Sequence, residues 1–199
     1  MEDFIYDDDL QQDENINYGV EDLDGDGNVD MIWQNEDTDG DGVIDHTSVL
    51  IDTNGDGIID TAMEGYDFNN DGVMDMITTA QDTNYDGNPD YLAINHDMDG
   101  NGTMDLEEYA DTDNNGTFET YGMNLDTNGD GNYDTAYIEQ DVNGDGQADY
   151  EAVYADTNHD GMYDQIYISE DTNGDGIIDK SQVYYDDNYD GTFDRVQNA

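Results

Sequence analysis

The chain has 199 residues, and its 54 Asp and Glu residues greatly outnumber its 2 Lys and Arg residues, so the formal net charge is −52. Leu, Ile, Val and Phe make up only about one residue in six, which is too few for an ordinary packed core. Nucleic acid and anionic membranes are excluded as direct partners because almost no basic residues are present to neutralise phosphate. The absence of Cys excludes disulfides and thiolate metal sites.

A nine-residue motif, Asp-x-Asn/Asp-x-Asp/Asn-Gly-x-apolar-Asp/Glu, recurs twelve times. Successive copies begin 15 residues apart, except for one interval of 14 between Asp97 and Asp111. One register before the first full copy, Asp7, Asp9 and Gln11 form a degenerate copy. We therefore predict a degenerate cap repeat at 1–21, followed at 22–199 by a single array of twelve 15-residue repeats.

Each unit divides into a nine-residue loop and a connector of about six residues. In chain order, the clearest connectors are 91–94, 135–138 and 165–168, which are rich in β-branched and aromatic residues and too short for helices. They predict short strands, in which the many Tyr residues form cross-strand aromatic pairs. No segment has the roughly 18 apolar residues of a membrane span, so membrane insertion is not expected. No signal peptide is visible at the start of this sequence.

Two loop positions that are not candidate ligands are restricted in every copy, position six to Gly and position eight to apolar residues. Position six is always Gly, from Gly27 to Gly191, which predicts a backbone with positive φ at a sharp turn. Position eight is apolar in every copy, from Val29 to Phe193. We expect this column of side chains to point inward and to supply much of a small core.

The five odd-numbered loop positions supply the candidate ligands. Position one is always Asp, at Asp22, Asp37, Asp52, Asp67, Asp82, Asp97, Asp111, Asp126, Asp141, Asp156, Asp171 and Asp186. Position three is Asp or Asn, at Asp24, Asp39, Asn54, Asn69, Asn84, Asp99, Asp113, Asn128, Asn143, Asn158, Asn173 and Asn188. Position five is Asp or Asn, at Asp26, Asp41, Asp56, Asp71, Asp86, Asn101, Asn115, Asp130, Asp145, Asp160, Asp175 and Asp190. Position nine is acidic, at Asp30, Asp45, Asp60, Asp75, Asp90, Asp105, Glu119, Asp134, Asp149, Asp164, Asp179 and Asp194. Position seven varies and offers its main-chain carbonyl, at Asn28, Val43, Ile58, Val73, Asn88, Thr103, Thr117, Asn132, Gln147, Met162, Ile177 and Thr192.

Alternating oxygen ligands around a tight Gly turn suit a hard cation that takes 6 to 8 oxygens at flexible geometry, which is Ca²⁺. Mg²⁺ demands stricter octahedral geometry, and Zn²⁺ would need the His or Cys ligands that the repeated positions lack. A solvated acidic tail would not require Gly and an apolar residue at fixed positions of every copy. The sequence therefore predicts about twelve calcium sites.

The loops at 52–60 and 171–179 read Asp-Thr-Asn-Gly-Asp-Gly-Ile-Ile-Asp. They resemble the calcium-binding loops of integrin-type propellers and bacterial surface proteins, and more distantly those of thrombospondin type 3 repeats. The resemblance implies that strands flank each loop and that the carboxylate at position nine closes the site. It covers about half of the chain and leaves the overall fold open.

One copy also matches the EF-hand loop, because Glu108 stands at its twelfth position. This copy precedes the 14-residue interval. We expect a local irregularity near 106–110, with a helical turn over 106–109 and a differently coordinated ion. The next loop has Asn115 and Glu119 in place of two Asp residues, and we expect it to be the weakest site.

For the fold class we predict an all-β, calcium-stapled repeat protein, with a β-solenoid of 30-residue coils as the first choice. The alternative is an antiparallel β meander with a calcium loop at each hairpin. A metal-cored wire with little sheet is the third architecture. In any of these, uncapped ends of the array predict end-to-end or edge self-association.

We expect the function to be that of a calcium-binding structural module that folds and stiffens when calcium binds. Such a module would serve as a stalk, spacer or adhesive segment of an extracellular or bacterial cell-surface protein, where calcium is millimolar. The alternatives are a calcium-dependent module that binds an ice, glycan or mineral surface, and a calcium buffer. The Thr column at loop position two favours the surface-binding alternative if its hydroxyls face solvent.

No catalytic residue is predicted, and we expect the protein not to be an enzyme. His46, His96 and His159 occupy different positions in their repeats and do not recur beside the same candidate catalytic residues. We therefore expect them to be packing or solvated residues. No triad or activated nucleophile can be read from the sequence.

Overall fold

The structure is a computed structural model that describes residues 15–199, so the degenerate copy at Asp7, Asp9 and Gln11 lies outside the described residues. The predicted connectors are strands. The described residues form thirteen strands, which are β1 (Ile16–Glu21), β2 (Met31–Glu36), β3 (His46–Ile51), β4 (Thr61–Tyr66), β5 (Met76–Gln81), β6 (Tyr91–His96), β7 (Asp105–Ala110), β8 (Thr120–Leu125), β9 (Thr135–Gln140), β10 (Tyr150–Ala155), β11 (Gln165–Glu170), β12 (Lys180–Tyr185) and β13 (Arg195–Asn198). The described residues contain no helix that could span a membrane.

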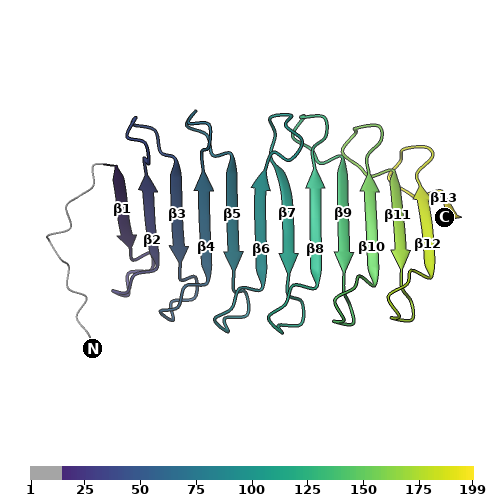
Figure 1. Cartoon of the computed structure of the whole chain (residues 1–199), viewed down its shortest axis with the longest axis horizontal. Helices are drawn as coiled ribbons and strands as arrows, with labels where there is room; N and C mark the ends of the chain where they lie inside the picture. The colour runs from purple at the N-terminus through teal and green to yellow at the C-terminus, as the bar shows by residue number, and fades with distance from the viewer. Residues whose placement is uncertain (1–14) are drawn as a thin grey trace.

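All thirteen strands form one antiparallel sheet in which each strand pairs only with its neighbours in sequence (Figure 1). The β-solenoid prediction was therefore wrong, and the antiparallel meander is the observed architecture. The reason lies in how each loop ends. The N–H of Asp30 donates to the carbonyl of Glu21 at 2.9 Å, and the equivalent bond closes ten further hairpins. In the remaining hairpin, Asp105 is part of β7 and pairs with His96. Each loop thus returns the chain beside the strand that it left, whereas a solenoid needs it to cross to a second sheet.

The register repeats from hairpin to hairpin. Ile16 lies opposite Glu36, and His46 lies opposite Tyr66, so the first residue of one strand faces the last residue of the next. Successive units are consequently related by a half-turn about an axis that runs across the strands. The half-turn places alternate loops at opposite edges, six at each edge, and exchanges the two faces of the sheet from unit to unit (Figure 1).

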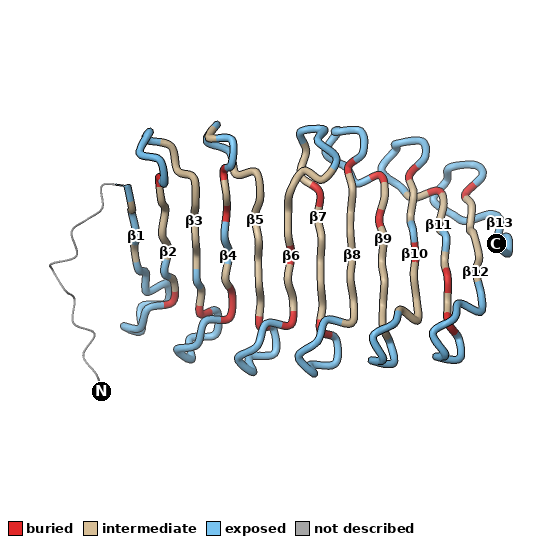
Figure 2. The backbone as a smooth tube through the Cα atoms, viewed as in Figure 1, coloured by how far each residue is buried: buried red, intermediate tan, exposed pale blue. Residues whose placement is uncertain are grey.

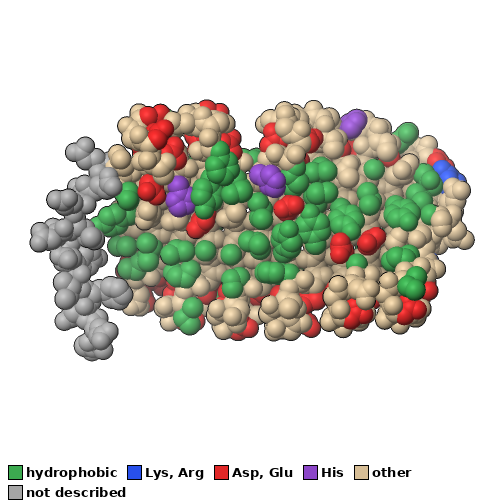
Figure 3. Space-filling view, in the orientation of Figure 1, with side chains coloured by type: hydrophobic (Ala, Val, Ile, Leu, Met, Phe, Trp, Pro, Cys, Tyr) green, Lys and Arg blue, Asp and Glu red, His purple; other side chains and the backbone are tan. Residues whose placement is uncertain are grey.

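The sheet is a single layer, and it has almost no apolar core. Among the described residues, the only buried apolar side chains are those of Ala93, Ala136 and Ala152. Most of the other buried residues are Asp residues at the strand ends, while the loops are exposed (Figure 2). On the face shown in Figure 3, acidic side chains gather at both loop edges, and a band of hydrophobic side chains crosses the strands between them.

The apolar column at loop position eight folds over the sheet without becoming buried. Tyr163 packs against Tyr154 of β10 with ring centroids 5.5 Å apart, and Phe193 lies 6.3 Å from Tyr184 of β12. Phe193 nevertheless remains 37% exposed, and Val29 is 46% exposed. The expectation that this column supplies much of a core was therefore wrong, because a single layer gives it no second sheet to pack against.

The predicted aromatic pairing between strands is confirmed. Tyr109 of β7 lies opposite Tyr121 of β8, and their ring centroids are 5.1 Å apart. The ring of Tyr137 in β9 lies 6.0 Å from that of Tyr121. These rings form a ladder across three strands, which contributes cross-strand packing where a second layer is missing.

The single 14-residue interval changes the start of β7. The expected helical turn over 106–109 is absent, because these residues belong to β7. The connector is one residue short, so Asp105, the ninth residue of its loop, becomes the first residue of the strand and pairs with His96. The irregularity is confined to Asp105, which belongs both to the loop and to β7, and the later strands keep the regular register.

Candidate metal centres

Each loop contains two residues with left-handed backbone conformation. The invariant Gly at position six has φ between 81° and 96° in all twelve loops, as the sequence predicted. Position four is also left-handed, with φ between 59° and 82°. Sequence reasoning missed this second position, although Gly occupies it in seven copies and Asn in two. Together the two turns direct several main-chain N–H groups toward the loop interior.

The carboxylate at position one receives these N–H groups. In the loop at 52–60, Oδ1 of Asp52 accepts the N–H of Gly55 and Oδ2 accepts the N–H of Gly57, each at 2.7 Å. Asp52 is only 6% exposed, and burial alone would raise its pKa. The main-chain N–H groups of Gly57, Gly55 and their neighbours outweigh burial and lower the pKa, so the charged form is stabilised.

The carboxylate at position nine closes the loop onto position two. Oδ2 of Asp60 accepts both the N–H and the hydroxyl of Thr53 at 2.8 Å. The hydroxyl and N–H of Thr38 likewise lower the pKa of Asp45. Because these hydroxyls are used within their own loops, the Thr column gives no support to a surface-binding ladder.

Positions three and five point their side chains at the following main chain. Oδ1 of Asn54 accepts the N–H of Asp56 at 2.8 Å, and Oδ1 of Asp56 accepts the N–H of Ile58 at 2.9 Å. Each side chain uses one oxygen in this way. The second oxygen of the Asp56 carboxylate stays available to a cation, whereas Asn54 has no second oxygen and its amide oxygen would have to serve both partners.

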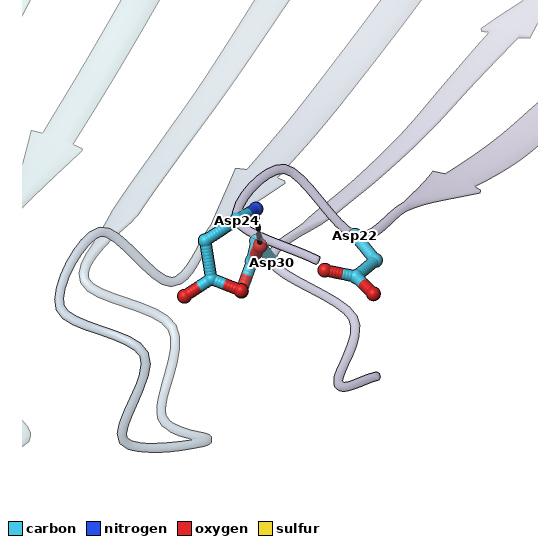
Figure 4. Close-up of side chains that lie close together, drawn as sticks. All are labelled: Asp22, Asp24 and Asp30. Carbon is cyan, nitrogen blue, oxygen red and sulfur yellow. Dashed lines mark hydrogen bonds between the residues drawn. The ribbon is translucent and has the colours of Figure 1, made fainter. Parts of the chain in front are cut away.

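Carboxylate oxygens from positions one, three and nine converge in four loops. In each group, one oxygen per residue lies within 4.8 Å of the oxygens of the other two. The groups are Asp22, Asp24 and Asp30; Asp37, Asp39 and Asp45; Asp97, Asp99 and Asp105; and Asp111, Asp113 and Glu119. Figure 4 shows the first group, in which the N–H of Asp24 donates to Asp30 at 3.2 Å.

These four loops are the ones with Asp at position three. In the other eight, Asn at position three offers an amide oxygen in place of the third carboxylate. The loops with Asp at position three therefore contain acidic groups that could hold cations. Crowding of like charges is visible at Asp39: partial dehydration raises its pKa, and the carboxylates of Asp41, Asp45 and Asp37 raise it further. A cation would relieve this repulsion.

Some predicted ligands lie outside the convergent groups. The position-five carboxylates do not belong to them. The main-chain carbonyls at position seven stay predicted ligands. Glu108 stands in β7 between Ala93 and Gly122 of the neighbouring strands, and the hydroxyl of Tyr91 donates to its carboxylate at 2.5 Å. The structure therefore gives Glu108 a partner within the sheet and does not bring it to the group formed by the loop that precedes it.

No protein-family model, curated protein or solved structure matches the chain. The interpretation of these loops therefore rests on their own geometry and chemistry.

Proposed function

We propose that the chain is a calcium-binding structural module that folds and stiffens when its loops take up Ca²⁺. The observation that carries this proposal is the convergence of three carboxylates within 4.8 Å in a sheet whose described part buries only three apolar side chains. Hydrophobic burial does not account for the fold, so the binding energy of the ions is the natural replacement.

Electrostatics support the same conclusion. A net charge of −52 opposes compaction, and carboxylates that converge without a cation repel one another. Twelve divalent ions would bring the net charge to about −28 while placing positive charge where the repulsion is strongest. Calcium suits this donor set because all the repeated ligands are oxygens and the loops are irregular.

The shape of the sheet favours a role as a stalk or spacer of an extracellular or cell-surface protein. β1 and β13 lie at opposite ends of the row of strands (Figure 1). Twelve strand spacings of about 4.8 Å separate them by about 60 Å. Loops of this kind in extracellular modules bind calcium at millimolar concentrations, so such a spacer would stay unfolded inside a cell and become rigid outside.

The experiment is a titration of the full chain with Ca²⁺ from excess chelator, followed by far-ultraviolet circular dichroism, with Mg²⁺ as the control ion. We expect a cooperative transition from coil to β structure with Ca²⁺ alone and a stoichiometry of about ten or more ions by calorimetry. An identical β spectrum in chelator would exclude metal-driven folding. A chain that remains coil at saturating calcium would indicate a flexible ion buffer.

A matched pair of variants separates ligand loss from charge loss. Asp52→Asn replaces a loop carboxylate and keeps an oxygen that can accept the N–H of Gly55. Glu151→Gln removes one negative charge from β10, outside the loops. We expect Asp52→Asn to lose about one bound ion and Glu151→Gln to retain the full number. Equal stoichiometry in the two variants would contradict the ligand role of position one.

A further inference from the structure

Loops that are neighbours at one edge of the sheet are joined through their ligand residues. The N–H of Asp67, position one of the loop at 67–75, donates to the main-chain carbonyl of Asp45, position nine of the loop at 37–45, at 2.8 Å. These two loops are two units apart in sequence. The loop between them in sequence, at 52–60, lies at the opposite edge, across six-residue strands that are about 20 Å long.

The bond from position one to position nine divides the loops of the two edges differently. At the edge that begins with the loop at 22–30, five such bonds join six loops into one unbroken row. The members of this row are the loops at 22–30, 52–60, 82–90, 111–119, 141–149 and 171–179. At the other edge, no such bond joins Asp97 to Asp75 in the described part of the chain. The loops at 37–45 and 67–75 are therefore a pair, separate from the four loops that follow at this edge.

The 14-residue interval accounts for this interruption. Asp105 belongs to β7, and its carboxylate accepts the N–H of Asp126, in the next loop at the same edge, at 2.8 Å. The side-chain amide of Asn101 donates to the main-chain carbonyl of Asp126 as well. Both bonds hold the loop at 97–105 toward the loop at 126–134 and away from the loop at 67–75. The wider spacing between the loop after β4 and the loop after β6 is visible at the upper edge (Figure 1).

Side-chain contacts follow the same division. The amide of Asn70 donates to Asp41 at 2.6 Å and lies 3.4 Å from a carboxylate oxygen of Asp39, so it connects the loop at 67–75 to ligand positions of the loop at 37–45. Among the hydrogen bonds of the described residues, none joins the loop at 67–75 to the loop at 97–105. The interruption therefore affects side chains and main chain alike.

Each bond between loops links the ligands of one candidate site to those of the next. When a loop closes, its position-nine residue is fixed, and its carbonyl is held where the N–H of the neighbour's position one can donate to it. That bond in turn fixes the residue whose carboxylate begins the neighbouring site. A loop beside a closed neighbour therefore loses less conformational freedom when it closes, which is positive coupling between the two sites.

We propose that calcium binding is coupled along the edges of the sheet, between loops two units apart, and not between loops that are consecutive in sequence. One edge forms a coupled row of six loops, and the other is divided into a pair and a group of four. Consecutive loops share a strand, but about 20 Å separates them, which exceeds the Debye length of about 8 Å at physiological salt. This inference rests on the proposed calcium function and specifies which sites influence one another.

The test empties one loop without changing its net charge. The loop at 67–75 carries three carboxylates, so one Ca²⁺ brings its charge to −1. The double variant Asp67→Asn with Asp71→Asn keeps one carboxylate and has the same charge of −1 without an ion. The main-chain N–H of residue 67 remains able to donate to Asp45. A response of another loop therefore reports lost order in the emptied loop and not a changed electrostatic field.

Closure is followed loop by loop through the amide resonances of ¹⁵N-labelled glycine while the full chain is titrated with Ca²⁺. The N–H of the Gly at position six donates to the position-one carboxylate of its own loop, as Gly42 does to Asp37 at 2.7 Å, so its resonance reports on that loop. In the variant, we expect the calcium midpoint of Gly42 to rise about fivefold or more. The midpoints of Gly57 and Gly87, at the opposite edge, and of Gly102, beyond the interruption, should change by less than about twofold.

A second variant empties a loop inside the unbroken row. Asp141→Asn with Asp145→Asn leaves the loop at 141–149 with one carboxylate and the same matched charge. The midpoints of its two neighbours at the same edge should rise, and those of the two consecutive loops should not; the reporters are Gly116 and Gly176 for the former and Gly131 and Gly161 for the latter. Circular dichroism at saturating calcium shows whether each variant is folded, and each tests the inference without the other.

Two results would overturn the inference. Equal shifts in consecutive loops and in neighbours at the same edge would mean that the whole sheet transmits the effect. Shifts confined to the emptied loop would mean that the sites are independent. Failure of the calcium proposal itself has a different signature, because the glycine resonances of the native chain would then not respond to calcium at all.

Discussion

Oδ1 of Asp105 accepts the main-chain N–H of Asp126 at 2.8 Å, and these residues are 0% and 1% exposed. In eight other loops, the first residue donates its main-chain N–H to the main-chain carbonyl of the ninth residue of the preceding loop at that edge, as Asp111 does to Asp90. Asp105 starts strand β7, so its side chain takes over the role of that carbonyl. Its other oxygen accepts the N–H of Met98 within its own loop. One carboxylate thus joins two loops.

Asp105→Asn is expected to destabilise this junction by about 1–3 kcal/mol, because an amide can accept only one of the two N–H groups and leaves the other buried without a partner. Hydrogen exchange in saturating calcium provides the measurement: the Asp126 amide should exchange faster in the variant. In the control variant, Asp90→Asn, the Asp111 amide should stay protected, because it donates to a main-chain carbonyl. Equal protection of Asp126 in the native chain and in Asp105→Asn would contradict the shared role.

Gly57→Ala tests the left-handed turn at loop position six. No atom lies within 4 Å of the Cβ that this change adds, so the expected loss of about 1–2 kcal/mol comes from the φ of 88° alone. Gly122→Ala is the matched control: its backbone is not left-handed, and the new Cβ meets its nearest atom at 3.8 Å. We expect the control to be neutral or slightly stabilising in chemical denaturation at fixed calcium. A cost as large as that of Gly57→Ala would argue against strain as the cause.

Gly19→Ala probes the packing of the single tryptophan. A Cβ at residue 19 would lie 2.6 Å from the indole ring of Trp33, which pairs with Gly19 across β1 and β2. The ring must move off β1, and we expect a red-shifted fluorescence maximum together with a loss of about 1–2 kcal/mol. Gly122→Ala should leave the emission unchanged, because residue 122 lies in β8. Unchanged emission in Gly19→Ala would show that the ring does not cover this glycine.

Asn54→Asp adds a third carboxylate at positions one, three and nine of the loop at 52–60. Calcium affinity in such loops rises with the number of ligand charges, so we expect this site to bind several-fold more tightly. Asn95→Asp adds the same charge within strand β6, away from the loop, and should leave the affinities nearly unchanged. Competition with a chromophoric chelator measures both variants. An equal effect of the two variants would mean that overall charge matters more than ligation.

Tyr137 is expected to be among the last tyrosines to ionise. Burial raises its pKa above the usual value of about 10, and so do the hydrogen bond that its hydroxyl donates to Glu139 at 2.8 Å and the negative charge of Glu151. The folded chain therefore retains this proton while the unfolded chain releases it near pH 10. The resulting contribution to stability is complete below pH 10 and is lost as pH rises further.

Ultraviolet titration at saturating calcium measures this ionisation through phenolate absorbance. Tyr137→Phe should remove a late-titrating phenol, and its free energy of unfolding should fall less steeply above pH 10. Glu139→Gln should bring the ionisation of Tyr137 to lower pH. Identical titration curves for the native chain and Tyr137→Phe would show that this phenol is not protected.

The sequence by itself determined the features that depend on a few adjacent residues. The 15-residue period separated loops from strands, and invariant Gly residues such as Gly57 marked a left-handed turn, because φ > 0 is costly for other residue types. The order of Asp and Asn residues predicted oxygen clusters, and the carboxylates at positions one, three and nine converge in the four loops that have Asp at position three. The second left-handed position could also have been predicted from its seven Gly and two Asn residues, although the other three copies carry Tyr or His there.

Only the tertiary structure decided how the units are arranged. Both a solenoid and a meander fit the same local loops. The choice between them depends on the hydrogen bond that closes a hairpin, such as the one from the N–H of Asp30 to the carbonyl of Glu21. Contacts between loops follow from that choice: the sheet places loops two units apart side by side, which brings His159 to Asp134 and Asp105 to Asp126. Residues so far apart in sequence meet because of topology, and no local pattern encodes their contact.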